Sequence, residues 1–186
     1  TNYFITMKKL ILSLLVAAFV GGNTLSAQTI TKNEDGKYSL SVGHVTLTVD
    51  AQKGGKIVSY RYDDKEILSQ TKIPNSFGST FWTSPQSEWN WPPVPEYDTK
   101  PFNAEVAGDK LILTGEKSKR FGYRVRKELT TDKKDNAIVI TYTIINESGE
   151  TRKVAPWEIS RVPNGGILFF DAKEVTPANN METMPF

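Results

Sequence analysis

The chain has 186 residues, of which 38% are hydrophobic, 11% aromatic and 24% charged, with one His and no Cys. This length favours one domain, and the apolar fraction excludes an intrinsically disordered protein. The lack of cysteine excludes disulfides and thiolate zinc sites, and a formal net charge of +2 is too small to indicate a nucleic-acid-binding protein.

Residues 1–27 have the order of regions that is typical of a secretory signal peptide behind a short N-terminal extension. Met7-Lys8-Lys9 is basic, residues 10–20 form an apolar run of 11 residues, and Ala27 ends a small-residue segment. The run is shorter than the roughly 20 residues of a membrane-spanning helix. We therefore expect cleavage after Ala27 and an exported, periplasmic or secreted protein without a stable membrane span. No Cys is present to carry a lipid anchor, so we do not expect a lipoprotein.

The small positive charge belongs to this signal peptide. Removing residues 1–27 removes Lys8 and Lys9 but no acidic residue, which leaves 21 of the 23 basic residues against 21 acidic ones. A basic cluster within residues 117–127 alternates with other residues, and we interpret it as a solvated strand face. We expect no nucleic-acid partner.

After a polar lead-in at residues 28–37, hydrophobic residues recur at every second position, the period of a β-strand. Gly43-His44 and Gly54-Gly55 interrupt the pattern and predict turns. No later segment keeps a helical period, so the sequence predicts an all-β, antiparallel sandwich or large curved sheet over residues 38–186. The expected strands are 38–42, 45–50, 57–62, 66–69, 111–114, 121–129, 137–145, 153–162 and 166–171.

Residues 73–102 lack a strand pattern and hold six of the ten prolines and three of the four tryptophans. A plain connector of about 30 residues would be unusual in a compact domain. Its aromatic residues predict a loop that packs on the sheet and exposes at least one of the rings of Trp82, Trp89 and Trp91.

The aromatic loop suits a carbohydrate ligand. A sugar ring offers apolar C–H faces to aromatic rings, while its hydroxyl groups bind planar polar side chains. Trp82, Gln86, Trp89, Asn90 and Trp91 supply both kinds of group within ten residues. The alternative is that the tryptophans only fix the loop to the sheet.

Other kinds of chemistry find little support in the sequence. His44, the one histidine, lies at a break between strands and is interpreted as a structural or surface residue rather than as part of a catalytic triad. No phosphate-binding glycine motif occurs, and we expect neither a metal site nor a cofactor.

The segment 81–93 (FWTSPQSEWNWPP) resembles the FWPSPQ…W-x-WPP signature of the DUF4380 family, a family of exported bacterial proteins grouped with the galactose mutarotase-like fold. Residues 54–60, the strand ending at Asn146 and residues 155–162 with Gly165-Gly166 agree with it. The resemblance covers about residues 38–171. It implies an antiparallel β-supersandwich that holds sugars in its concave face. Complete family members extend well beyond the position of Phe186, so we expect a fragment.

The resemblance leaves enzymatic activity open. In aldose mutarotases of this fold a Glu near the C-terminus is the base and histidines protonate the ring oxygen. Here the segment where a histidine is expected reads Pro156-Trp157-Glu158, and His44 lies too early to replace it. We name Glu158 as the candidate acid or base.

Arg161 is the last candidate ligand-binding residue. Residues three apart on a strand point to opposite faces, so Glu158 and Arg161 are not expected to share one pocket unless a bulge intervenes. One of them is then a ligand and the other a structural partner. The favoured function is carbohydrate binding, and the alternative is a non-catalytic exported module that contacts another protein.

Overall fold

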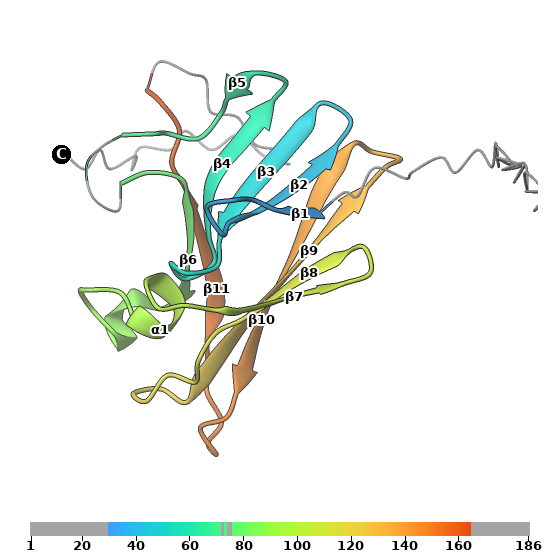
Figure 1. The fold of residues 1–186 in the computed structure, drawn as a ribbon. Helices are drawn as coiled ribbons and strands as arrows, with labels where there is room; N and C mark the ends of the chain where they lie inside the picture. Colours follow the sequence, from blue (N-terminus) through green and yellow to red (C-terminus); the bar gives the residue numbers. More distant parts are fainter. Residues whose placement is uncertain (1–29, 72, 74–75, 165–186) are drawn as a thin grey trace, which may run out of the picture.

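The computed structural model describes residues 30–71, 73 and 76–164, which form two antiparallel sheets (Figure 1). The first sheet has the order β1 (Ile30–Lys32), β2 (Tyr38–Val42), β3 (Val45–Asp50), β4 (Lys56–Tyr62), β6 (Ser79–Ser84) and β11 (Ala155–Ser160), and β5 (Lys65–Glu66) pairs with β4. The second has the order β10 (Ala137–Asn146), β9 (Tyr123–Asp132), β8 (Lys110–Thr114) and β7 (Asn103–Ala107). The prediction of an all-β antiparallel sandwich is confirmed.

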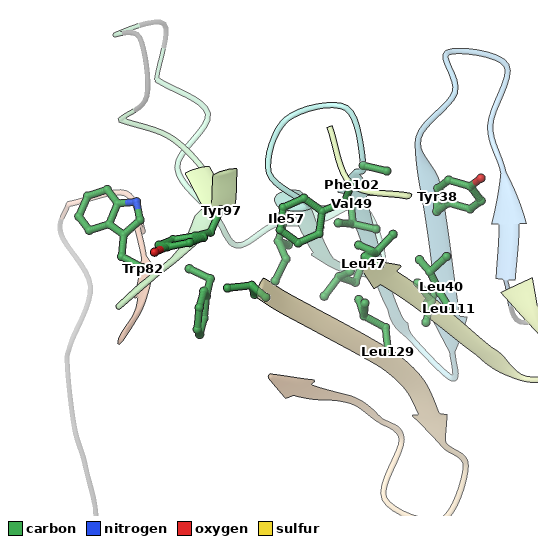
Figure 2. Close-up of a cluster of buried hydrophobic side chains, with 14 of the residues drawn as sticks. Tyr38, Leu40, Leu47, Val49, Ile57, Trp82, Tyr97, Phe102, Leu111 and Leu129 are labelled. Atoms are coloured by element: carbon green, nitrogen blue, oxygen red, sulfur yellow. The ribbon is translucent and has the colours of Figure 1, made fainter. Parts of the chain in front are cut away.

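The core lies between the two sheets. In β2, β3 and β9 every second residue is buried, as expected for strands with one face on the core. Figure 2 shows leucines from both sheets pointing toward one another in this layer. They are Leu40, Leu47, Leu111 and Leu129.

The prediction that residues 73–102 contain no strand is wrong. The segment includes β6, the 3₁₀ turn η1 (Gln86–Glu88) and the short helix α1 (Pro95–Asp98). Five of the six residues of β6 are buried, so its two faces are covered and its sequence shows no alternation. The edge strand β7 was not predicted because four of its five residues are exposed.

Smaller differences concern the ends of elements and two side chains. The strand expected at 66–69 is the two-residue β5, and the one expected at 166–171 lies outside the described residues, as do Gly165-Gly166 and the signal peptide. His44 is an exposed turn residue with Nδ1 2.6 Å from Asp63 Oδ1, as a surface histidine was expected to be. Lys127, which we placed on a solvated face, is instead buried.

Lys127 is held between the sheets by the Gly54-Gly55 turn. Its Nζ donates to the carbonyl oxygens of Gly54 at 2.8 Å and Gly55 at 2.9 Å. The rings of Phe102 and Tyr142 lie 5.3 and 5.7 Å from Nζ. Burial lowers the pKa of Lys127 from its ordinary value of 10.5 to about 8, although the nearby negative charges partly oppose this.

Because the Lys127 amine is buried, we expect the stability of the fold to increase at alkaline pH. Between pH 8 and 10.5 the unfolded chain binds more protons than the folded one at Lys127, so the free energy of unfolding rises with pH in that window. We expect Lys127 to contribute a gain of about 2 kcal/mol between pH 8 and 10. The buried Lys56, whose pKa is also lowered to about 8, adds to the rise in the same window. Above pH 10 the buried Tyr97, whose pKa is raised to about 12, reverses the trend.

Urea unfolding at pH 7.5, 8, 9 and 10 measures this dependence. Lys127→Met removes one of the two buried lysines that titrate in this window, so its profile between pH 8 and 10 is expected to be flatter than that of the unsubstituted chain. Lys65→Met, a change of the same charge at an exposed position, is the control and should keep the original slope. Parallel profiles for all three chains would contradict the prediction.

Candidate functional site

The four tryptophans form one cluster, composed of Trp82, Trp89, Trp91 and Trp157. Trp82 on β6 is central, with the ring centroids of the other three 5.7, 5.9 and 5.6 Å away and each of them edge-on to it. Trp91 is 70% exposed, whereas Trp82 and Trp89 are 9% and 2% exposed. The expectation of at least one exposed ring is therefore met by Trp91.

The two buried rings of the loop are fixed by hydrogen bonds. Trp82 Nε1 donates to Asp98 Oδ1 at 2.8 Å, and Trp89 Nε1 donates to the carbonyl oxygen of Thr83 at 2.8 Å. Arg120 also donates to the carbonyl oxygen of Trp89 at 3.3 Å. Trp82 and Trp89 thus fix the loop to the sheet, the alternative considered for them above, and of these three rings Trp91 is the exposed one.

The pairing of β6 with β11 separates the candidate acid or base from the tryptophans. Trp82 lies opposite Trp157 and Phe81 lies opposite Glu158, so each pair shares a face of the sheet. Phe81 stacks on Tyr142 of the second sheet with ring centroids 4.8 Å apart. Phe81 and Glu158 therefore belong to the inner face, and the tryptophan pair belongs to the outer face.

Glu158 has its own neighbours on the inner face. Its carboxylate accepts a hydrogen bond from Ser79 Oγ, which lies 2.9 Å from Ser160 Oγ. Burial and then the charge of Glu158 raise the pKa of Tyr142. Glu158 and the tryptophan cluster do not form one site in this structure.

Arg161 lies on the outer face with the tryptophans. Its guanidinium carbon is 5.9 Å from the ring centroid of Trp82, and its Nη1 donates to Thr80 Oγ1 at 3.1 Å. Burial lowers the pKa of Arg161, while the charges of Asp98 and then Glu158 oppose the shift. Arg161 and Glu158 thus point to opposite faces, as their spacing predicts.

Two further residues of this face, Lys56 and Asp98, were not predicted from the sequence. Lys56 is 5% exposed, and its Nζ lies 4.0 Å from the ring centroid of Phe77. Burial and then the charge of Arg161 lower the pKa of Lys56 to about 8, while Asp98 opposes this. A lysine or an aspartate cannot be recognised as buried or solvated from the sequence around it. The one local signal near Lys56 was the Gly54-Gly55 turn that precedes it.

An open depression adjoins the cluster beside Trp157. It has a volume of about 450 Å³, and Gln86 of η1 lies on its wall. Gln86 and Asn90 are both exposed, so they present amide groups to solvent as predicted residues of the site. The lining residues are Ser84, Pro85, Gln86, Ser87, Ala155, Pro156 and Trp157.

Comparisons with known proteins do not assign a family. No family model matches the chain, and no curated protein matches it. Among solved structures, the chain is similar to a 4-alpha-glucanotransferase from Thermococcus litoralis, with 15% identity and a TM-score of 0.40. The match covers 61% of this chain and 23% of that one, so the chain spans less than a quarter of that protein's length.

The described part of the chain contains neither a metal-binding cluster nor a membrane-spanning helix. Within residues 30–71, 73 and 76–164, no group of three or more His, Asp and Glu is placed to hold a metal ion. Over the same residues, no helix has the length and apolar character needed to cross a membrane.

Proposed function

We propose that the protein binds carbohydrate on the outer face of β6 and β11, with the Trp91 ring as the stacking surface. The observation that carries this proposal is that a large apolar ring, 70% exposed, is held in a defined orientation by Trp82. Exposed tryptophans of this kind are common in binding sites, because the ring offers a rigid apolar face at little cost in conformational entropy.

Polar groups beside the ring suit the hydroxyl groups of a sugar. Gln86 and Asn90 are exposed on the same loop as Trp91. The guanidinium group of Arg161 lies over the ring of Trp82, which in turn contacts Trp91. Amide and guanidinium groups are planar and offer several donors each, which matches neighbouring hydroxyls on a sugar ring. Membership of the DUF4380 family and export by residues 1–27 are part of the proposal, and both agree with an extracellular saccharide as ligand.

The proposed site binds a saccharide without a catalytic group beside it. Glu158, the candidate acid or base, is exposed on the inner face, whereas the tryptophan cluster lies on the outer face. General acid–base catalysis requires the group within hydrogen-bond reach of the reacting atoms. A sugar stacked on Trp91 would not have Glu158 at that distance.

Replacing Trp91 with Ala tests the proposal. We expect Trp91→Ala to weaken saccharide binding by about tenfold or more, because the ring supplies the apolar contact. Isothermal titration with a panel of neutral and acidic oligosaccharides measures the affinity. Tyr62→Ala, a change at another exposed aromatic residue (54% exposed), is the control and should bind as the unsubstituted chain does. Absence of binding to every saccharide in the panel would overturn the proposal.

A second candidate function is an interaction module that contacts another protein. It is favoured by the large exposed apolar side chains Ile73, Trp91 and Val162, which are 54%, 70% and 62% exposed. Within the described residues β11 pairs with β6 alone, and a strand edge of this kind is a surface on which another chain can pair. Concentration-dependent association in sedimentation experiments, together with no response to saccharides, would favour this function over the first.

A further inference from the structure

Two positively charged side chains, one buried and one half-buried, lie on the outer face beside the tryptophan cluster. Lys56 comes from β4 and is 5% exposed, and Arg161 follows β11 and is half-buried. Among the described residues, neither cation lies within 4.0 Å of a carboxylate oxygen, in contrast to Lys100, Lys110 and Arg124 elsewhere in the chain. Burial of a charge without an ionic partner is unfavourable, so this pair is unusual.

Gly78 lies beside both cations and connects their positions in the sheet. Gly78 accepts a hydrogen bond from the backbone N–H of Arg161 at 3.0 Å. A Cβ atom at Gly78 would lie 3.5 Å from Cε of Lys56, so the lysine stem passes directly over this glycine. Strands β4, β6 and β11 are thereby adjacent at this point, and their two long side chains occupy the same face.

One carboxylate of the described residues serves both cations, and it is already engaged. The Asp98 charge acts on Lys56 and Arg161, while Asp98 Oδ1 accepts the indole N–H of Trp82. The Glu158 charge also acts on Arg161, but from the inner face of the sheet. On the outer face two cations therefore stand against the one carboxylate of Asp98, which leaves an excess positive charge in a desolvated position. Such a site favours an anionic ligand, because electrostatic attraction is stronger where water is excluded.

We infer that the Lys56–Arg161 pair binds the carboxylate of an acidic saccharide whose ring stacks on Trp91, an inference that rests on the proposed function. The guanidinium carbon of Arg161 and the ring centroid of Trp91 each lie 5.9 Å from the ring centroid of Trp82. The charged group and the stacking ring therefore adjoin the same indole. Among the described residues, the Arg161 side chain donates one hydrogen bond, to Thr80, out of the five N–H groups that a guanidinium carries. A planar guanidinium fork matches a planar carboxylate with two hydrogen bonds, and the Lys56 ammonium adds a point charge.

Calorimetric titration with matched oligosaccharides tests the inference on the full chain. Oligogalacturonate and oligoglucuronate are compared with neutral oligosaccharides of equal length and with a sulfated oligosaccharide. We expect the uronates to bind about tenfold more tightly than the neutral sugars at low salt. Lys56→Met, which keeps an unbranched side chain of similar length, should remove most of the preference for uronates over neutral sugars.

Two more variants separate charge from geometry. Arg161→Lys keeps the positive charge but loses the planar fork, and we expect it to lower uronate affinity about as much as Lys56→Met does. Lys65→Met, the same change of charge at an exposed position of β5, should keep the preference. Thermal unfolding of each variant confirms that it is folded before its affinity is interpreted.

The outcomes distinguish this inference from the proposed function. Neutral sugars that bind as tightly as uronates would overturn the acidic-saccharide inference and leave carbohydrate binding standing. A uronate preference that survives both Lys56→Met and Arg161→Lys would overturn the assigned site. Tighter binding of the sulfated sugar than of the uronates would overturn the carboxylate specificity. Absence of any saccharide binding would overturn both proposals.

Discussion

Gly54→Ala is expected to lower the free energy of unfolding by more than about 4 kcal/mol, which places it among the most damaging single substitutions. Gly54 has φ of +65°, a conformation that costs energy for any residue with a Cβ atom. An added Cβ would also lie closer than 3.0 Å to the backbone carbonyl oxygens of Tyr97 and Asp98 in α1. Backbone cannot move aside as a flexible side chain can, so the turn and the helix must separate.

Gly108→Ala is the matched control for this prediction. Gly108 lies in the β7–β8 turn with φ of +64°, but nothing lies within 4 Å of an added Cβ. It isolates the backbone strain from the clash, and we expect a loss of about 1 to 2 kcal/mol. Urea denaturation followed by far-UV circular dichroism measures both variants. Equal losses for the two glycines would show that the contact between the turn and α1 contributes little.

Trp82→Ala has the second largest expected effect, a loss of about 3 to 5 kcal/mol. Trp82 is 9% exposed, contacts the other three tryptophan rings and donates its indole N–H to Asp98. Its removal leaves a cavity at the centre of the cluster and an unpaired carboxylate oxygen. The same urea experiment measures the loss by circular dichroism, because the fluorescence changes with the tryptophan itself.

Trp91→Ala provides the contrast on the same cluster. The ring is 70% exposed, so we expect its removal to cost less than about 1 kcal/mol of stability while it weakens saccharide binding. The two tryptophans thus divide stability and binding between them. A loss of stability for Trp91→Ala equal to that for Trp82→Ala would contradict this division.

The strands with one covered face are predictable from the sequence, and those with two covered faces or none are not. The regions of β2, β3, β9 and β10 show the period of two because the core selects apolar residues at alternate positions. In β6 both faces are covered, so neither its burial nor its sequence alternates, and the strand was hidden in an aromatic segment. In β7 solvent covers most positions, and no apolar pattern arises.

The sequence indicates which residue types form the site, but not which residues the fold brings together. The sequence places Trp82, Gln86 and Trp91 close together in the chain, but the fold adds Trp157 and Arg161 from a strand about 70 to 80 residues further on. Which ring is exposed depends on hydrogen-bond partners such as Thr83 and Asp98, which no local pattern indicates. The burial of Lys56 likewise depends on the neighbouring strands and on Phe77.

The pairing of β6 with β11 has a consequence for the order of folding. Ser79 and Ser160 lie 81 residues apart in sequence, and the whole second sheet, a series of consecutive hairpins, lies between them (Figure 1). Local hairpins close quickly, whereas closing a long loop costs more entropy, so we expect the β6–β11 pair to form late. The surface shared by Trp82 and Trp157 then exists only in the fully folded chain. A ligand bound there would select the native state alone and raise the unfolding temperature as its concentration increases.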